Sequence, residues 1–214
     1  MHASTASIPS FSFNAAVALD GRRSFARPRA ISFYGAGTEI YAQGELAGAL
    51  YRIEYGAVRI FRLLADGRRQ VVAFHVAGET FGFEARTMRS FFAESIVPTG
   101  LTTLTIEESG RASSELMALA LESMVRAQEH LLVVGKQSAL EKVAVFLVDL
   151  YERQGANGLI DLPMTRTDIG DYLGLTIETV SRSFSKLRSM GVIRLKSARA
   201  VEVLNLTKLR LTSI

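Results

Sequence analysis

The 214-residue sequence contains no cysteine. This absence excludes disulfide bonds, cysteine-bound iron–sulfur clusters and thiol redox switches within the chain. Histidine is scarce as well, because His2, His75 and His130 lie far apart and offer no zinc-ligand spacing. We therefore expect no metal site, no cofactor and no catalytic residues, although three histidines do not by themselves exclude haem.

Long uncharged apolar runs are also missing. No stretch approaches the roughly 20 apolar residues of a membrane span, so we expect no membrane association. Residues Met1–Asp20 lack the positive start and continuous apolar run of a secretory signal. We interpret them as a flexible lead-in to a cytoplasmic protein, whose 48% hydrophobic content suffices for a packed core.

The net charge of +4 is carried entirely by the last quarter of the chain. Residues 160–214 contain nine Lys and Arg against five Asp and Glu, whereas the first 159 residues contain sixteen of each. A small basic module attached to a neutral body suits a surface that binds phosphates. A slightly basic solvated surface would give the same count, so charge alone does not decide between the two.

Residues from about Ile31 to Ile106 are predicted to form β-structure, because short apolar segments alternate with glycine-containing turns. Asp66-Gly67 separates two such segments and predicts a hairpin. Many short strands at regular spacing favour a barrel or roll, which we assign to residues 1–111. A cupin-like barrel enzyme is an alternative, but it needs clustered metal ligands, and His75 has no second histidine in this region.

Turn residues disappear after Ala112, and a long helix is predicted there. One of its faces carries a heptad seam with a single polar position, made of Met117, Leu121, Met124, Gln128 and Leu131. The seam can face the same helix of a second copy, or it can pack against the chain's own β-domain. We assign residues 112–136 to a dimerisation helix and residues 137–214 to a C-terminal domain.

The C-terminal domain contains two short predicted helices joined by a tight turn. Thr165 or Thr167 can cap a first helix that begins at about Asp168, and Gly174 stands where such a helix ends in a left-handed conformation. Thr176 can cap the second helix. Its apolar face recurs at helical spacing in Val180, Phe184 and Leu187. Two short helices around a glycine-containing turn are typical of a helix-turn-helix.

Beyond Gly191 the sequence predicts a β-hairpin with its turn at Lys196–Arg199, which makes the module a winged helix-turn-helix. The second helix would enter the major groove with its N-terminal residues on base edges. Arginine can donate two hydrogen bonds to guanine and glutamate can accept one from cytosine. We therefore expect base contacts from Glu178, Ser181 and Arg182. We expect contacts with the DNA backbone from Thr167, Thr176, Thr179, Ser183, Lys186, Arg188, Lys196 and Arg199.

The alternative is a helical hairpin whose polar residues merely face water. In that case Glu178 and Arg182 would form an ordinary ion pair one helical turn apart. The complete order of cap, helix, glycine turn, helix, glycine and wing favours DNA binding over this alternative.

The run Asp168–Arg182 closely resembles the DNA-binding signature of the CRP/FNR superfamily, and Glu178, Ser181 and Arg182 together resemble its FixK-type branch. The cyclic-AMP receptor branch typically has an arginine where Ile177 stands. The resemblance extends over nearly the whole chain. It implies an α+β fold with an N-terminal β-roll like that of cyclic-nucleotide-binding domains, a long dimerisation helix and a C-terminal winged helix-turn-helix.

The resemblance also implies partners and a function. The chain would be a transcription activator, not an enzyme, and would act as a homodimer joined along the long helix. It would bind double-stranded DNA at a palindrome whose half-sites begin TTG and lie one helical turn apart. RNA polymerase would be a further partner, and the turn Asp66–Arg69 resembles a loop that contacts it, although its charges suit any solvated turn.

The family's cyclic-nucleotide cassette is not reproduced in full. In the family an Arg-Ser pair holds the phosphate, whereas here Phe91 and Phe92 stand about where that arginine belongs. Glu94 close by would repel a phosphate, and Arg86 and Arg89 are the candidates to substitute for the missing cation. The absence of cysteine likewise excludes an oxygen sensor of the FNR type.

These departures predict a regulator that binds DNA without a small-molecule coligand and is controlled by its abundance or stability. The alternative is a regulator that requires an unidentified effector in the β-roll. We also expect that negative charge added at Ser183, near the phosphates, would weaken DNA binding through repulsion.

Overall fold

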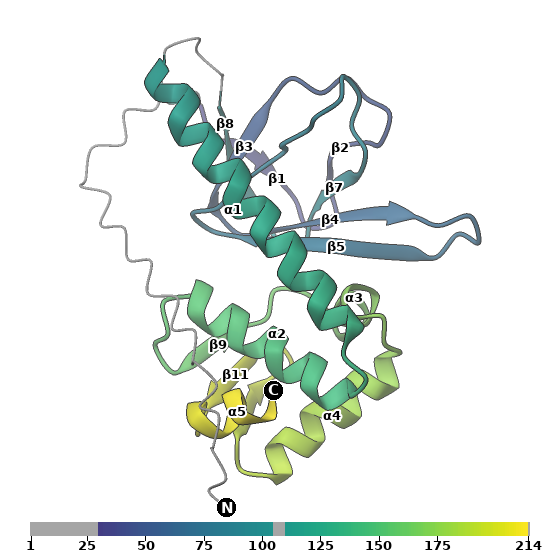
Figure 1. Cartoon of the computed structure of the whole chain (residues 1–214), viewed down its shortest axis with the longest axis vertical. Helices are drawn as coiled ribbons and strands as arrows, with labels where there is room; N and C mark the ends of the chain where they lie inside the picture. Colours follow the sequence, from purple (N-terminus) through teal and green to yellow (C-terminus); the bar gives the residue numbers. More distant parts are fainter. Residues whose placement is uncertain (1–29, 105–109, 214) are drawn as a thin grey trace, which may run out of the picture.

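Two four-stranded sheets form the N-terminal half of the molecule (Figure 1). The computed structural model describes residues 30–104 and 110–213, so the expected lead-in Met1–Asp20 and the expected end of the β-region at Ile106 lie outside it. The strands are β1 (Ser32–Tyr34), β2 (Glu39–Tyr41), β3 (Leu50–Tyr55), β4 (Ala57–Leu63), β5 (Arg69–Val76), β6 (Thr80–Phe81), β7 (Phe92–Ser95) and β8 (Thr99–Leu104).

The strands pair antiparallel in the orders β1-β8-β3-β6 and β2-β7-β4-β5. The expected hairpin is β4–β5, and Gly67 at its turn has a φ of 79°, which a side chain would disfavour. Ile53, Val58 and Leu101, contributed by both sheets, are fully buried in one apolar cluster. The predicted β-roll is therefore confirmed.

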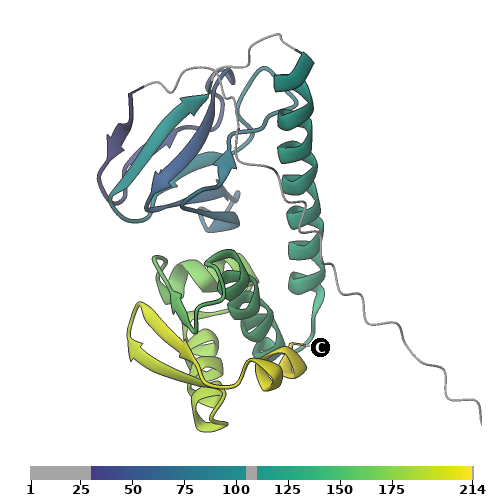
Figure 2. The ribbon, with the colours of Figure 1, turned by 90° about the vertical axis from the view of Figure 1, so that its left-hand side faces the viewer.

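Helix α1 (Gly110–Gly135) runs along one side of the roll and reaches the C-terminal domain (Figure 2). Its inner side meets the roll through Arg126, which lies 2.9 Å from the Glu79 carboxylate. The outer side carries the heptad seam, and all five seam residues are exposed, Leu131 by 70%. The alternative in which the seam packs against the chain's own β-domain is therefore wrong, because the opposite face of α1 makes that contact.

The C-terminal domain combines four further helices with a small sheet of order β10-β11-β9. Its elements are α2 (Ala139–Arg153), β9 (Leu159–Asp161), α3 (Arg166–Leu173), α4 (Ile177–Ser189), β10 (Ile193–Ser197), β11 (Ala200–Val203) and α5 (Leu206–Thr212). No pattern in the sequence predicts β9 or α5. β9 has three residues and exists by pairing with β11, and α5 has seven residues, too few to show a helical period.

The roll and the C-terminal domain share one apolar core. Phe61, Val71 and Phe74 of the roll belong to the same buried cluster as the apolar side chains of α2, α3 and α4. The Phe74 ring lies 5.1 Å from the ring of Tyr172 on α3. Polar contacts reinforce this interface, because the Arg153 guanidinium donates to both Glu79 carboxylate oxygens, at 2.9 and 3.0 Å, and to the Phe74 carbonyl at 2.6 Å.

His75 and Glu79 form a buried pair beside that arginine, with 3.2 Å between His75 Nδ1 and the carboxylate. Burial lowers the pKa of His75, and the charges of Arg153 and Arg126 act in the same direction, against the opposing effect of Glu79. Burial alone would raise the pKa of Glu79, but the hydrogen bond from His75 and the charge of Arg153 outweigh it and lower that pKa to about 2. The folded protein thus holds a neutral histidine beside an ionised carboxylate.

This pair predicts a loss of stability on acidification. As pH falls through 6.5, the ordinary pKa of histidine, the unfolded chain gains a proton at His75 that the folded chain does not, and stability decreases. A second loss follows between 4.5 and about 2, where Glu79 titrates in the unfolded and then in the folded state. In thermal unfolding followed by circular dichroism, His75→Gln should show a smaller decrease in Tm than the parent between about pH 7 and pH 5. Equal decreases in the two proteins would contradict this assignment.

Candidate nucleic-acid interface

The first helix of the expected pair is fixed by a reciprocal cap. The Thr165 hydroxyl accepts from the backbone N–H of Asp168 at 3.1 Å, and the Asp168 carboxylate accepts from the Thr165 N–H at 2.9 Å. Thr165 is therefore the cap, and α3 begins at Arg166, two residues before the expected start. Thr167 instead lies exposed in the first turn of α3.

A tight turn joins the two helices. Gly174 ends α3 in the left-handed conformation, at φ 66° and ψ 42°, as the sequence indicates. The backbone N–H of Leu175 donates to the Gly170 carbonyl at 3.0 Å, which folds the turn back against α3. A Cβ at Gly170 would lie 2.6 Å from the Leu175 carbonyl oxygen. Glycine at this position therefore permits the close approach of helix and turn.

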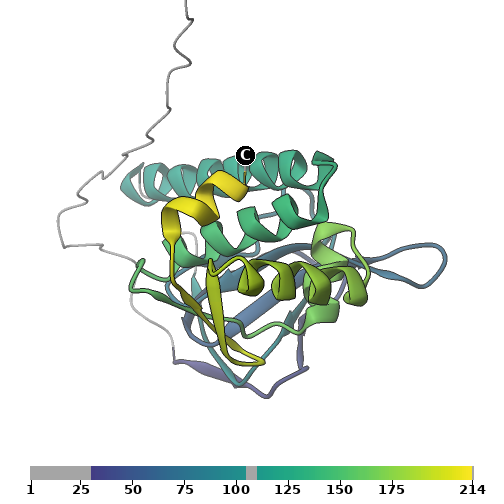
Figure 3. The same ribbon diagram turned by 90° about the horizontal axis from the view of Figure 1, so that it is seen from below.

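Helix α4 begins after the expected cap, because the Thr176 hydroxyl accepts from the Thr179 N–H at 3.3 Å. Val180, Phe184 and Leu187 are buried against the domain. The opposite side of α4 is uncovered in the described structure, at the end of the molecule away from the roll (Figure 3). Its N-terminal half therefore meets the steric requirement for entering a groove.

The three expected base-reading residues lie together on that uncovered side. Glu178, Ser181 and Arg182 are all exposed. The backbone N–H of Glu178 and the Thr176 hydroxyl lower the pKa of the Glu178 carboxyl, and the nearby charge of Arg182 adds to the effect. The exposed carboxylate is thus ionised and keeps acceptor sites beyond these two hydrogen bonds. The Arg182 guanidinium donates to the Thr179 hydroxyl at 3.4 Å.

The expected backbone-contacting residues are distributed around this face. Thr167 and Thr176 flank it at the starts of α3 and α4, and Thr179 is half-buried beneath Arg182. Lys186 and Arg188 are exposed in the last turn of α4. Among the expected backbone-contacting residues, Ser183 alone is buried.

The sequence places Ser183 on the DNA side of α4, and this prediction is wrong. The residue is only 6% exposed, and its hydroxyl donates to the Thr179 carbonyl at 2.9 Å. The reason is helical geometry, since position 183 lies between Val180 and Leu187 on the buried side. A charge added at Ser183 would be buried in the domain, so the expected repulsion of phosphates does not follow.

The wing is formed by β10 and β11, as predicted, with a tighter turn than expected. Lys196 is still part of β10, and Ala198-Arg199 lies between the two strands. Arg199 is exposed at this turn. Lys196 lies 3.1 Å from the Glu202 carboxylate, and this hydrogen bond, together with the charges of Lys196 and Arg194, lowers the pKa of Glu202. The side chains of Lys196 and Arg199 are therefore both exposed to solvent.

Arg166 is not among the residues that the sequence marks as part of the interface. It is the first residue of α3, and its guanidinium lies 3.4 Å from the centre of the Phe184 ring. Burial lowers its pKa to about 10, and Nη1 is buried without a partner within the described residues. No periodicity or cap signal marks this position, because the contact with Phe184 is made across the two helices.

The turn Asp66–Arg69 is only partly the solvated loop that the sequence predicts. Asp66 and Arg68 are exposed and pair with each other at 2.7 Å. The Arg69 side chain instead turns towards α3, where it contacts Asp168 and Asp171. The exposed part of the loop therefore ends at Arg68.

Groups of the protein itself occupy the place in the roll where the family's phosphate subsite would lie. Arg89 is 4% exposed, and it donates to the carbonyls of Gly82 and Ala49, both at 2.6 Å. The backbone N–H and hydroxyl of Ser90 donate to the Glu84 carboxylate at 2.8 and 2.9 Å. The expectation that Glu94 repels a phosphate is corrected, because Glu94 forms an ion pair with Arg59. Glu84 is the carboxylate that lies in this place.

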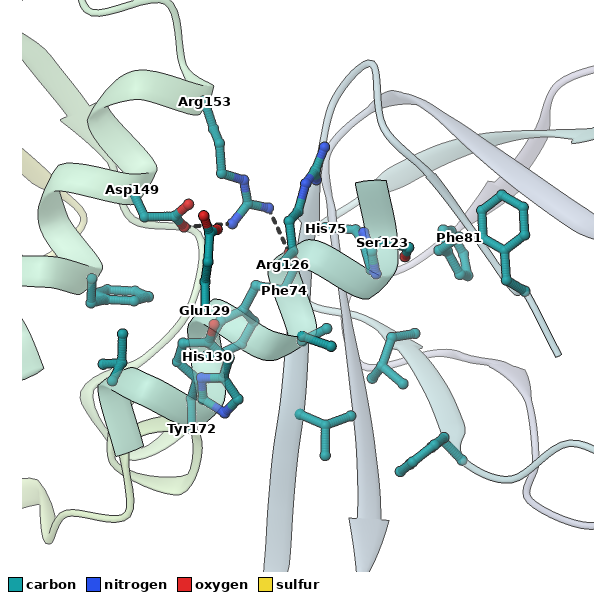
Figure 4. A pocket seen from close by; sticks show the side chains of 18 of the residues that line it. Phe74, His75, Phe81, Ser123, Arg126, Glu129, His130, Asp149, Arg153 and Tyr172 are labelled. Carbon is teal, nitrogen blue, oxygen red and sulfur yellow. Dashed lines mark hydrogen bonds and ion pairs between the residues drawn. The ribbon is translucent and has the colours of Figure 1, made fainter. Parts of the chain in front are cut away.

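A cavity of about 670 Å³ lies between the roll, α1 and α2 (Figure 4). Phe74, His75 and Phe81 line it from the roll, and Arg126 and His130 line it from α1. The His130 ring stacks on Tyr172 with the ring centres 3.9 Å apart. Within residues 30–104 and 110–213, no cluster of three or more His, Cys, Asp or Glu could hold a metal, and no helix is long and apolar enough to span a membrane.

Two family models match this chain. Residues 141–212 match the Crp-like helix-turn-helix domain, and residues 31–107 match the cyclic nucleotide-binding domain. Both matches agree with the elements described above, since the first spans α2 to α5 and the second spans β1 to β8.

Similar proteins cover most of the chain. The nitrogen fixation regulation protein FixK of Rhizobium meliloti is 54% identical over 183 residues, which is 86% of this chain and 87% of that protein. The transcriptional activatory protein AadR of Rhodopseudomonas palustris is 37% identical over 75% of this chain and 72% of its own length. The structure of FixK2 from Bradyrhizobium japonicum superposes with a TM-score of 0.84 at 35% identity, covering 88% of this chain and 98% of that one.

From the close approach of the turn between α3 and α4, we expect Gly170→Ala to lower the free energy of unfolding by about 1–3 kcal/mol. The added Cβ would meet the Leu175 carbonyl oxygen, which cannot rotate away. Chemical denaturation measures this change. Gly135→Ala is the matched control, since a Cβ at this helical glycine meets nothing within 4 Å and should change stability by less than about 1 kcal/mol. Equal effects of the two substitutions would refute the close-approach argument.

Proposed function

The chain belongs to the FixK branch of the CRP/FNR family of transcription regulators, and from this premise we propose that it activates transcription as a homodimer on TTG-type palindromes without a small-molecule coligand. The observation that carries the proposal is the exposed N-terminal half of α4. There Glu178, Ser181 and Arg182 share one side of a capped helix that nothing in the described structure covers.

The chemistry of these three residues suits direct reading of bases. The Arg182 guanidinium can donate two hydrogen bonds to guanine, the ionised Glu178 can accept from a cytosine amino group, and Ser181 can contact either kind of base. The hydroxyl and cationic residues around them, of which all but the half-buried Thr179 are exposed, would fix the register on the phosphates: Thr167, Thr176, Thr179, Lys186, Arg188, Lys196 and Arg199. The basic excess of the last quarter of the chain supports this assignment.

The exposed seam of α1 supports the homodimer. Met117, Leu121, Met124 and Leu131 are each at least half exposed in the single chain. A largely apolar seam on a helix is rarely left in water and is the usual contact of a coiled coil. Gln128, the one polar position of the seam, would set the register. A two-fold axis along α1 would present two α4 helices to half-sites one helical turn apart. In this proposal residues 112–136 are the dimerisation segment between the roll (1–111) and the DNA-binding domain (137–214).

The protein's own side chains support independence from a coligand. Arg89 already has two carbonyl partners and lies 4.2 Å from the centre of the Tyr41 ring. Glu84 takes up the hydrogen-bond donors of Ser90 and brings a negative charge that disfavours a phosphate. A cyclic nucleotide would have to displace both sets of contacts.

A second candidate function is a regulator gated by an effector, and the cavity beside α1 favours it. Its volume of about 670 Å³ lies in the range of small-molecule sites. The two functions differ in one measurement, a mobility shift with purified protein and no additive. A shift at moderate salt supports independence from a coligand, whereas a shift only after addition of a cell extract supports the effector.

The proposed activator would act in the cytoplasm and would contact RNA polymerase. The tip of the β4–β5 hairpin projects away from the body of the roll (Figure 1), and residues 62–68 are exposed. Asp66 is held by Arg68, whose backbone N–H lowers the pKa of the Asp66 carboxyl. The tip therefore offers a preformed charged loop for contact with the polymerase.

Base reading predicts different effects for two cations. Arg182→Ala should weaken operator binding by about 1–3 kcal/mol and relax the preference at one base pair, whereas Lys196→Ala should weaken all sequences similarly and reduce the salt slope by about one. Fluorescence anisotropy with single-base operator variants at several salt concentrations measures both. Arg210→Ala removes the same charge from α5, where Arg210 pairs with Glu152, and should change neither quantity. If Arg182→Ala lowered the affinity equally for all operator variants, Arg182 would not be a base-reading residue.

If the chain dimerises along the seam of α1, Leu121→Glu should be monomeric. Because Leu121 is 50% exposed in the single chain, the substitution should leave the fold intact while placing a charge in the seam. Sedimentation velocity should show the loss of the dimer, and operator affinity should fall about 100-fold as the linkage between half-sites is lost. The conservative Leu121→Met should remain dimeric. A dimeric Leu121→Glu protein with full affinity would locate the contact elsewhere.

A further inference from the structure

Two arginines of the roll bind the first helix of the DNA-binding domain. Arg59 on β4 donates to Oδ1 of Asp168 at 2.7 Å, and Arg69 on β5 donates to the same oxygen at 2.6 Å. Arg69 also donates to Oδ2 of Asp171 through Nε at 3.1 Å and Nη2 at 2.9 Å. We call these four residues the roll–helix ion cluster.

Asp168 is the centre of this cluster. Its side chain is 1% exposed, and its second oxygen accepts from the Thr165 N–H at 2.9 Å and from the Thr165 hydroxyl at 2.7 Å. The same carboxylate therefore caps α3 and accepts both arginines. A buried carboxylate is tolerated only when its hydrogen-bond capacity is filled in this way.

The surroundings of the cluster restrict its geometry. The guanidinium carbons of Arg59 and Arg69 lie 5.9 and 5.6 Å from the centre of the Phe61 ring. Gln70, next to Arg69, donates to the Asp171 carbonyl at 2.6 Å. Cationic groups placed between a ring and two carboxylates have few alternative arrangements. The cluster is therefore a directional contact between two domains.

The orientation of α3 determines the orientation of α4. The two helices are joined by the turn in which Leu175 bonds to Gly170, and they pack against the same apolar core. A rotation of α3 on the roll would thus carry Glu178 and Arg182 with it. In a two-fold dimer, where two α4 helices must reach two half-sites together, such a rotation changes their separation.

We propose that Arg59 and Arg69 are positioning residues for DNA binding, which hold the recognition helix in its DNA-reading orientation through Asp168 and Asp171. The inference rests on the proposed function, because it supplies from within the chain the orientation that a coligand would otherwise have to impose. Its basis is separate, however, since the cluster lies away from the base-reading face.

The sign of two substitutions tests the proposal. If the cluster acted only through its charge near DNA, Arg69→Met would weaken operator binding and Asp171→Asn would strengthen it. Positioning instead predicts that each weakens binding by about fivefold to tenfold, and that the double variant is no weaker than the weaker single variant. Opposite signs for the two single variants, or additive losses in the double variant, would overturn the proposal.

A distance measurement tests the orientation itself. Because the chain has no cysteine, spin labels can be attached to Gln43→Cys on the roll and Thr207→Cys on α5, both exposed positions. When the labelled chain is diluted in unlabelled chain, double electron–electron resonance spectroscopy reports the distance between the two spin labels within one copy. Arg59→Met with Arg69→Met should broaden that distribution and weaken operator binding, while thermal unfolding stays a single transition.

Arg62→Met with Arg68→Met is the matched control, since it removes the same charge from the same hairpin but from exposed side chains. It should leave the distance distribution and operator affinity unchanged. An unchanged distribution in the Arg59 and Arg69 variant would refute the positioning role. Failure of the unsubstituted protein to bind the palindrome would instead refute the proposed function, and the distances would still report on the cluster.

Discussion

The buried carboxylate of Asp168 links the local and the global structure of this protein. A charge removed from water in this way destabilises the fold by several kcal/mol unless donors surround it, and here the donors come from three separate places in the chain. Thr165 fills one oxygen, while Arg59 and Arg69 share the other. The start of α3, the docking of that helix on the roll and the resulting direction of α4 therefore depend on the same two oxygen atoms.

The rest of the interface between the roll and the C-terminal domain likewise pairs buried polar groups with partners from distant parts of the chain. Arg153 joins α2 to Glu79 and to the Phe74 carbonyl, and the apolar contact of Phe74 with Tyr172 belongs to the same interface. Within the roll, Arg89 and Ser90 are likewise satisfied by the chain itself. Under the proposed function, these internal pairs leave DNA as the polyanion that the exposed cations of the C-terminal domain would bind.

The parts of the fold that depend on neighbouring residues were readable from the sequence. Thr176 and Gly174 act through hydrogen bonds and backbone angles within one turn, so their roles follow from spacing alone. The seam of α1 follows from its period, but its exposure does not, because the period alone does not show which face of the helix packs on the roll. The burial of Ser183 does not follow from spacing. The width of the buried face of α4 depends on which neighbouring elements pack against that helix.

Features that depend on distant residues were not readable. Arg59 and Asp168 are 109 residues apart, and no period or motif connects them. Arg69 looked like part of a solvated turn because the sequence does not show that α3 lies beside it. β9 exists because β11, some 40 residues later, offers it an edge. The three proposed base-reading residues follow from local pattern and family resemblance, whereas the contacts proposed to orient them are visible only in the structure.

The apolar stripe of α1 has a consequence for the dose response of gene control. If two copies must pair along it before they can reach two half-sites, operator occupancy follows second-order mass action below the dimer dissociation constant. Halving the copy number would then reduce the active species about fourfold. A modest change in synthesis or proteolysis would thus change promoter occupancy more than proportionally, without any sensory ligand.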